Sequence, residues 1–190
     1  MQNTDKTIVR RCWWVNMKNP LYVEYHDREW GVPEHSDKKL YEMLMLECFQ
    51  AGLTWECVLN KRENIRQAFD DFDVEKVSRY DDEKCEQLLC APIIRNRSKI
   101  KACVTNSRVF MQIQKEFGSF DAYIWGFTDG RTIRESCDIR KTSPLSDTIS
   151  KDLKKRGMKF VGSTILYAYL QSIGVYHAHM QDCDCYNDRL

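Results

Sequence analysis

The feature of this sequence that most constrains its fold is the helical spacing of apolar residues, which is clearest in the stretch 36–55. Ser36 or Asp37 can cap a helix there, and Gly52 can end it in a left-handed turn. The apolar residues on one face are Leu40, Met43, Leu44 and Ala51. Glu47 falls on that face, although a glutamate is almost never fully buried without a partner. The stretch predicts either a carboxylate at the mouth of a pocket or a solvated glutamate at a helix end.

Helical spacing continues through the chain and almost nothing alternates with period two, so we predict an all-α fold. Segment 1–11 is polar, and we expect a flexible N-terminus followed by a single domain over 12–190. The expected helices cover about 21–27, 37–51, 55–69, a short stretch after Asp73, 81–90, 97–117, a short stretch after Ser119, 146–156 and 163–173. The polar residues 128–144 are expected to form a loop.

Composition excludes some classes of protein. No apolar run is long enough to cross a bilayer and no signal peptide precedes the domain, so we expect no membrane partner. The nine cysteines are odd in number, which favours a reducing, cytoplasmic compartment. We expect Cys57, Cys85, Cys90 and Cys103 to be buried. The net charge of +1 leaves nucleic-acid binding to local clusters.

The first candidate site is a metal site shared by the two ends of the chain. His179 and Cys183 have the spacing H-x3-C, which on a helix places both on one face. Cys12 and His26 could complete a Cys2His2 set for a structural Zn²⁺. The alternative ligands are His177, Cys185 and His35. The competing interpretation is a scatter of surface histidines and core cysteines.

The second candidate is a glycine-containing turn between two helices, residues 154–164. Exposed amides at a helix N-terminus beside lysines form an anion site, and a DNA phosphate is the natural anion. The candidate contacts are Gly157, Lys159, Gly162, Ser163 and Thr164. The alternative is an ordinary αα-hairpin with a solvated basic face. A second basic run, with Arg95, Arg97, Lys99 and Lys101, could add phosphate contacts.

The third candidate is a set of aromatic residues near Glu47. Tyr22 and Tyr25 are three residues apart and share a face if that stretch is helical. Together with Trp30 and Trp55 they could stack on a planar ring. The alternative is that these aromatics belong to the core.

The order of these motifs resembles the 3-methyladenine DNA glycosylase I (Tag) family of bacteria. The resemblance runs from Cys12 to Cys185. Its blocks are PLY…YHD…EWGVPE in 20–34, LE…QAGLTW and KREN in 46–64, IIRNR…KI in 93–100, and GMKFVG within 151–164. Cys48 and Phe49 depart from the family pattern and could reshape a pocket wall.

The resemblance implies a helix-hairpin-helix DNA glycosylase fold, with the hairpin helices over about 146–173 and a Zn²⁺ site joining the N- and C-terminal segments. Its zinc ligands fall on Cys12, His26, His179 and Cys183. Its catalytic residues fall on Glu47 and Tyr25, and its base-binding residues on Tyr22, Tyr25, Trp30, Glu47 and Trp55. Leu53 would fill the place of a flipped base, and the turn residues named above would contact DNA.

The activity implied is base excision repair, in which a monofunctional, monomeric glycosylase hydrolytically removes 3-methyladenine from double-stranded alkylated DNA. Asp182 is a minor candidate for a catalytic aspartate. Two other classes compete with this interpretation. One is a non-catalytic, zinc-stapled helical module that binds DNA or damaged bases, and the other is a thiol hydrolase that uses Cys48.

Overall fold

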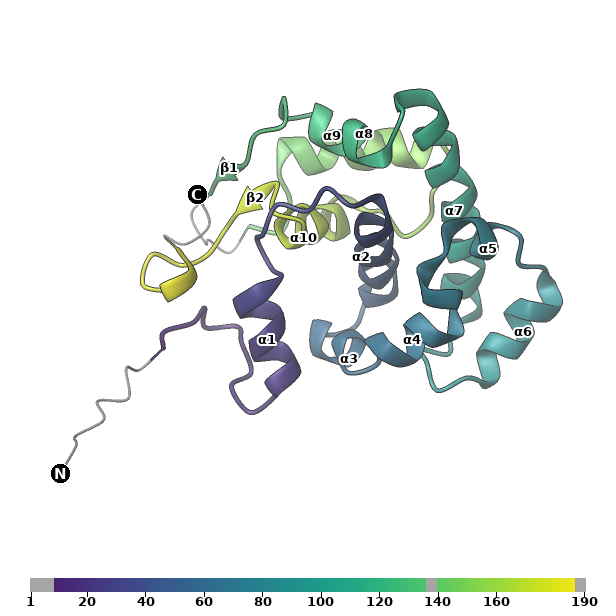
Figure 1. The fold of residues 1–190 in the computed structure, drawn as a ribbon, viewed down its shortest axis with the longest axis horizontal. Coiled ribbons are helices and arrows are strands. Elements are labelled where there is room, and N and C mark those ends of the chain that lie inside the picture. The colour runs from purple at the N-terminus through teal and green to yellow at the C-terminus, as the bar shows by residue number, and fades with distance from the viewer. Residues whose placement is uncertain (1–8, 136–139, 187–190) are drawn as a thin grey trace.

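The computed structural model describes residues 9–135 and 140–186, and it is helical almost throughout (Figure 1). The all-α prediction is confirmed. The helices are α1 (Pro20–Arg28), α2 (Asp37–Gln50), α3 (Trp55–Leu59), α4 (Arg62–Ala68), α5 (Val74–Ser78), α6 (Asp82–Cys90), α7 (Arg97–Phe117), α8 (Phe120–Gly126), α9 (Pro144–Lys155) and α10 (Ser163–Ser172), with short 3-10 turns at Asp70–Phe72 and Asp184–Tyr186. Most of the predicted segment 1–11 and the last residues of the predicted domain 12–190 lie outside the described residues.

Helices α2 and α10 form the centre of the molecule (Figure 1). α2 packs against α10, α9 covers α10, and α7 packs against α2, α5, α6 and α8 (Figure 1). α2 is buried along most of its length, with Leu40, Leu44 and Leu46 fully inaccessible to solvent. Asp37 ties α2 to α8, because its carboxylate accepts hydrogen bonds from the amides of Phe120 and Asp121. The central helix therefore has a fixed position before any ligand binds.

The two ends of the described chain lie side by side. The amide of Arg10 donates to the Asp184 carboxylate at 3.0 Å, and the Asp184 amide donates to the Arg10 carbonyl at 3.0 Å. The segment 178–183 is not helical, so His179 and Cys183 do not share the face of a helix. A turn rather than a helix brings these two side chains together.

Several predicted boundaries are wrong for identifiable reasons. The helix expected over 55–69 is two helices, broken at Asn60 and Lys61. α9 begins two residues before Ser146, because Ser143 and Ser146 exchange the hydrogen bonds of a capping box at its start. The expected loop 128–144 contains strand β1 (Ile133–Arg134), which pairs in parallel with β2 (Tyr176–His177).

The burial of the cysteines also differs in part from expectation. Cys85 and Cys103 are buried, Cys57 is half-buried and Cys90 is exposed. Within 9–135 and 140–186, none of the helices is both long and apolar enough to cross a bilayer.

Candidate functional site

Four elements, α1, α2, α3 and α10, converge on a cavity of about 210 Å³. It is lined by Trp14, Tyr22, Tyr25, Trp30, Glu47, Gln50, Trp55, Ala168 and Gln171. All five residues predicted to bind a base are in this lining. The cavity is smaller than a typical drug-sized pocket, which suits a single planar ring.

Helix α1 places both of its tyrosines at the cavity. The Asn19 side chain caps the helix and Pro20 occupies its first turn, so α1 starts at a defined residue. Tyr25 is buried, and its ring lies 5.0 Å from that of Trp55, centroid to centroid. Trp14 contacts both Tyr22 and Trp30, at 5.6 and 4.7 Å between centroids. These aromatic side chains, the aromatic wall of the cavity, are therefore already packed against one another without a ligand.

Among the described residues, Glu47 is the only acidic or basic side chain in the lining of this cavity. It is 3% exposed, and its Oε2 has no hydrogen-bond partner within the part of the chain that the structure describes. Burial raises the pKa of Glu47 from its ordinary value of 4.5 to about 8. A buried acceptor without a donor is costly, so the cavity is suited to a ligand that brings a donor or a positive charge.

One more polar atom of the cavity lining is buried without a partner among the described residues, and this one is a donor. Trp55 Nε1 is buried, and no described residue accepts its hydrogen. Burial is the main cause that raises the pKa of Tyr22 to about 12 and that of Tyr25 well above 10, and Glu47 adds to both shifts. Both tyrosines keep their phenolic hydrogens at neutral pH. The cavity thus offers one acceptor carboxylate among several donors.

The Leu53 turn, residues 51–54, lies next to this cavity. Gly52 adopts φ +77°, as predicted for a helix-ending glycine, and Leu53 is 38% exposed. Gln50 Nε2 donates to the Leu53 carbonyl at 2.7 Å, and Thr54 caps α3 by accepting from the Cys57 amide. An apolar side chain is therefore held exposed on a stiff turn.

The hairpin turn, residues 156–162, joins α9 to α10 and does not line the cavity. Gly157 has φ +104°, and Gly162 occupies the N-cap position of α10 without any capping side chain. Lys159 and Thr164 are exposed. The hydroxyl of Ser163 is shared with Ser146 at 2.8 Å, so its amide is the group left to face a ligand.

The second basic run is only partly a surface feature. Arg95, Arg97 and Lys101 are exposed, but Lys99 is buried. Its ammonium donates to the carbonyls of Phe49 and Ala51. The expectation that Lys99 lies on a phosphate-binding surface is therefore wrong.

Cys12, His26, His179 and Cys183 form a buried cluster whose four ligand atoms lie within 4.8 Å of one another. Three sulfur–nitrogen separations are 3.6 Å: Cys12 Sγ to His179 Nδ1, Cys183 Sγ to His179 Nδ1, and Cys183 Sγ to His26 Nε2. A tetrahedral ion with ligand bonds of about 2.3 Å to sulfur and about 2.0 Å to nitrogen would set this separation at roughly 3.5 Å. The cluster can hold a metal ion.

The other ring nitrogens of the two histidines are also engaged. His26 Nδ1 lies 2.8 Å from Asp27 Oδ1, and His179 Nε2 lies 3.2 Å from the Trp30 carbonyl. Outer partners of this kind orient histidine ligands toward a metal. The alternative ligand His35 instead lies 2.7 Å from an oxygen of Asp121. His177 and Cys185 are outside the four-residue cluster, although Cys185 lies close to His26 and Asp27.

Four cavity residues were not singled out from the sequence. Gln50 follows Glu47 by three residues on the same helix, so helical spacing could have identified it. Ala168 and Gln171 come from α10, and no sequence signal connects them to the cavity. Trp14 precedes α1, and no helical spacing relates it to Tyr22 and Tyr25.

Asp182 and Cys48 are outside this site. Asp182 is exposed and absent from the cavity lining. Cys48 is fully buried, and burial is the main cause that raises the pKa of its thiol to about 12. A buried, protonated thiol is not a nucleophile, which argues against the thiol hydrolase interpretation.

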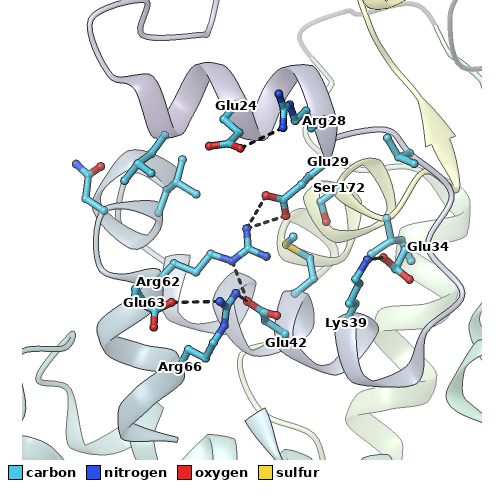
Figure 2. A pocket seen from close by; sticks show the side chains of 16 residues that line it. Glu24, Arg28, Glu29, Glu34, Lys39, Glu42, Arg62, Glu63, Arg66 and Ser172 are labelled. Atoms are coloured by element: carbon cyan, nitrogen blue, oxygen red, sulfur yellow. Dashed lines mark hydrogen bonds and ion pairs between the residues drawn. The ribbon is translucent and has the colours of Figure 1, made fainter. Parts of the chain in front are cut away.

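A larger cavity, of about 470 Å³, lies among α1, α2, α3 and α4 (Figure 2). Its charged side chains are all paired with one another. Arg62 binds Glu29 and Glu42, and Arg66 binds Glu42 and Glu63. The remaining pairs are Glu24–Arg28 and Lys39–Glu34. This cavity has no unmatched group that would recognise a ligand.

Comparison with known proteins gives consistent matches over nearly the whole chain. A family model described as "Methyladenine glycosylase" matches residues 14–186. DNA-3-methyladenine glycosylase 1 of Escherichia coli (strain K12) is 45% identical over 186 residues, which cover 94% of this chain and 97% of that protein. The DNA-3-methyladenine glycosylase of Haemophilus influenzae is 40% identical over 182 residues, 92% of this chain and 97% of that one.

Solved structures match equally well. A crystal structure of 3-methyladenine DNA glycosylase I (TAG) superimposes with a TM-score of 0.89 at 43% identity, covering 93% of this chain and all of the other. A variant of that type of enzyme in complex with 3-methyladenine superimposes with a TM-score of 0.87 at 31% identity, covering 91% and 96%.

Proposed function

We propose that this chain, which belongs to the methyladenine glycosylase family, removes 3-methyladenine from alkylated double-stranded DNA by hydrolysis of the glycosidic bond. The observation that carries the proposal is the buried Glu47, which has no cationic partner in a cavity lined by aromatic side chains. The reaction belongs to base excision repair, and the curated relatives are named for the same activity.

The chemistry of the substrate explains why such a simple site is sufficient. A 3-methyladenine residue in DNA is cationic, and its base leaves as a neutral molecule. The glycosidic bond is already weak, so the enzyme does not need a strong acid to activate the leaving group. What the site must do is select the cation and hold it outside the base stack, since chemistry on a base requires that it be flipped out.

Glu47 supplies the selection. A cationic base places a positive charge beside the buried carboxylate, which no cationic side chain of the cavity lining does. This charge favours the ionised form of Glu47. The carboxylate then accepts charge-assisted hydrogen bonds from the amino edge of the base, worth roughly 1.5–3 kcal/mol each. Normal adenine carries no charge and leaves the cost of ionising Glu47 uncompensated. Tyr25, with its hydroxyl protonated, adds a donor beside Glu47.

The aromatic side chains hold the ring. Tyr22 and Trp55 contact a planar base on its faces, and a cation over an aromatic ring in a desolvated site contributes roughly 2 kcal/mol. Trp30 supports this wall through its contact with Trp14. The wall also excludes water from the glutamate, which strengthens its interaction with the cation.

The two exposed turns contact DNA in this proposal. α9, the hairpin turn and α10 act as a helix-hairpin-helix motif. In this motif the free amides at the start of α10 and the ammonium group of Lys159 bind backbone phosphate without reading sequence. Leu53 fills the space that the flipped nucleotide leaves. No lysine of the segments 9–135 and 140–186 lines the cavity, and we propose a monofunctional enzyme without lyase activity.

We assign the Cys2His2 cluster to a structural Zn²⁺, because two thiolates and two imidazoles in a closed, buried set suit that ion best. When bound, the ion supplies a crosslink between the two chain ends and no catalytic group. His179 and His26 lie against Trp30, at 4.6 and 6.2 Å between ring centroids, so the metal site supports one wall of the cavity.

The deciding experiment is release of free base from DNA treated with a methylating agent. We expect the purified protein to release 3-methyladenine and to leave adenine in place. Unmethylated DNA of the same sequence is the control. Tight binding to methylated DNA without base release would instead identify a non-catalytic binding module, and no interaction with either DNA would contradict the proposal.

A further inference from the structure

The Leu53 turn is held by a buried lysine. Lys99 is 5% exposed, and its Nζ donates to the Phe49 carbonyl at 2.7 Å and to the Ala51 carbonyl at 2.6 Å. These carbonyls belong to the end of α2, where the last four lack partners within the helix and the helix dipole is negative. A buried ammonium at this place fixes the backbone immediately before Gly52 and Leu53.

The hairpin turn is held by a buried asparagine from the same helix. Asn106 is fully buried, its Nδ2 donates to the Lys159 carbonyl at 2.9 Å, and its Oδ1 accepts from the Lys159 amide at 2.8 Å. Both backbone groups of Lys159 are therefore occupied. The next residue, Phe160, has φ +55°, which is rare for a bulky side chain and requires support from its surroundings.

Cys48 contacts the second of these supports. It lies on α2, and its Sγ is 3.5 Å from Asn106 Nδ2 and 3.8 Å from the Lys159 carbonyl. The thiol is a small, neutral group that lets α2, α7 and the hairpin turn meet without a gap. This contact gives Cys48 a packing role, in place of the pocket-wall and nucleophile roles considered from sequence.

The spacing on α7 joins these observations. Lys99 and Asn106 are seven residues apart, so they lie on nearly the same helix face about 10 Å apart along the axis. We infer that Lys99 and Asn106 are positioning residues, which set the Leu53 turn and the hairpin turn in one rigid arrangement that matches duplex DNA. This inference rests on the proposed function, because it takes both turns to contact DNA.

Replacement of Lys99 separates positioning from base binding, since neither Lys99 nor Asn106 lines the cavity. We expect Lys99→Met to lower kcat/KM on a methylated duplex about tenfold or more, because a small misplacement of a substrate-positioning element is costly. Binding of free 3-methyladenine should change by less than about twofold. Lys115→Met, an exposed lysine on the same helix, is the control and should change neither value.

A double-mutant cycle identifies the element through which Lys99 acts. If Lys99 works by holding Leu53 in place, the losses of kcat/KM caused by Leu53→Ala and by Lys99→Met should not multiply. The kcat/KM of the double variant should then be within about threefold of that of the less active single variant. Fully multiplicative losses would overturn the positioning role. Lys99→Arg, which keeps the charge and the donors, should recover most of the loss.

Amide hydrogen exchange tests the inference without any reference to catalysis. Exchange in peptides covering 49–55 should be faster in Lys99→Met, and exchange in peptides covering 157–162 should be faster in Asn106→Leu, while α5 and α6 stay unchanged. If Lys99→Met does not fold, Asn106→Leu alone carries the measurement, through the peptides covering 157–162. Unchanged exchange in both turns would overturn the inference even if the protein excises 3-methyladenine. Faster exchange in a protein without base release would contradict only the proposed function.

Discussion

The two cavities beside α1 differ in how their charges are matched, and in our proposal this difference distinguishes a binding cavity from one that only stabilises the fold. The larger one is lined by charged side chains that are all paired, with Arg62 between Glu29 and Glu42 (Figure 2). The smaller one holds a single buried carboxylate, Glu47, without a cation. Matched charges stabilise the packing of helices, whereas an unmatched one is tolerated only where a ligand completes it. Size alone would have favoured the other cavity.

The largest expected effect follows removal of the Zn²⁺ that we propose for the Cys2His2 cluster. This removal tests whether the wall of the smaller cavity depends on the cluster. We expect a strong chelator, or Cys183→Ala, to lower Tm by about 10 °C or more, since metal binding free energy adds to folding free energy. Binding of free 3-methyladenine should be lost in the same samples. Cys90→Ala removes an exposed cysteine and serves as the control. Unchanged Tm and base binding in metal-free protein would contradict a structural metal.

The next largest effect is expected for Glu47→Gln, which should raise stability at pH 8 and lower activity. The pKa of Glu47 is raised to about 8, so between about pH 4.5 and 8 the unfolded chain binds fewer protons than the folded one. Stability contributed by the protonated carboxyl is complete below pH 4.5 and is lost as pH rises through 8, up to roughly 5 kcal/mol. Glu47→Gln should remove this loss, as measured by urea unfolding at pH 5 and pH 8.

The same substitution should reduce activity. Loss of one charge-assisted hydrogen bond to the cationic base predicts a decrease in kcat/KM of roughly 10- to 150-fold. In the unsubstituted protein, kcat/KM should rise with pH toward a plateau above about pH 8, because the free enzyme must ionise Glu47. The variant should lack this dependence. A Glu47→Gln protein as active as the original would show that Glu47 does not recognise the base.

The third effect concerns the larger cavity, where we expect a substitution to lower stability and to leave activity nearly unchanged. Arg62→Met breaks contacts to both Glu29 and Glu42, and Glu42 has a side chain only 10% exposed. Breaking a buried pair from one side costs roughly 3 kcal/mol or more, so urea unfolding should shift to lower concentration. We expect kcat/KM per folded molecule to stay within about threefold. A large loss of activity with unchanged stability would mean that the larger cavity takes part in binding.

The sequence was most informative where a helix signal and a chemical anomaly coincided. Ser119, Gly118 and Asn96 bound helices that the sequence placed correctly, because capping chemistry is local. Glu47 was recognisable because a carboxylate on an apolar face violates the helical pattern. The identity of the four clustered Cys and His residues could be suggested from spacing, but not their meeting point, which depends on the turn 178–183.

The remaining features depend on contacts between distant segments. Lys99 looked like one cation in a basic run, and only the tertiary structure shows its ammonium on the carbonyls of α2. Ser143 was not identified as the start of α9, because the more typical Ser146-Asp147 follows three residues later. Strands β1 and β2 contain two residues each, which is too short for any periodic signal. Gln171 reaches the cavity from a helix more than one hundred residues from Glu47.

The smallest effect compares two tryptophans, one whose indole N–H has no partner among the described residues and one whose N–H is hydrogen-bonded. Trp55 Nε1 has no described acceptor, whereas Trp125 Nε1 donates to the Glu34 carbonyl at 2.9 Å. Trp55→Phe keeps a flat ring at the cavity but removes the donor, so kcat/KM should decrease about 3- to 10-fold with little change in stability. Trp125→Phe removes a donor that is already satisfied inside the protein, and should lower stability by roughly 1 kcal/mol while kcat/KM is unchanged. Equal effects of both substitutions on kcat/KM would mean that unmatched polar groups do not mark the binding site.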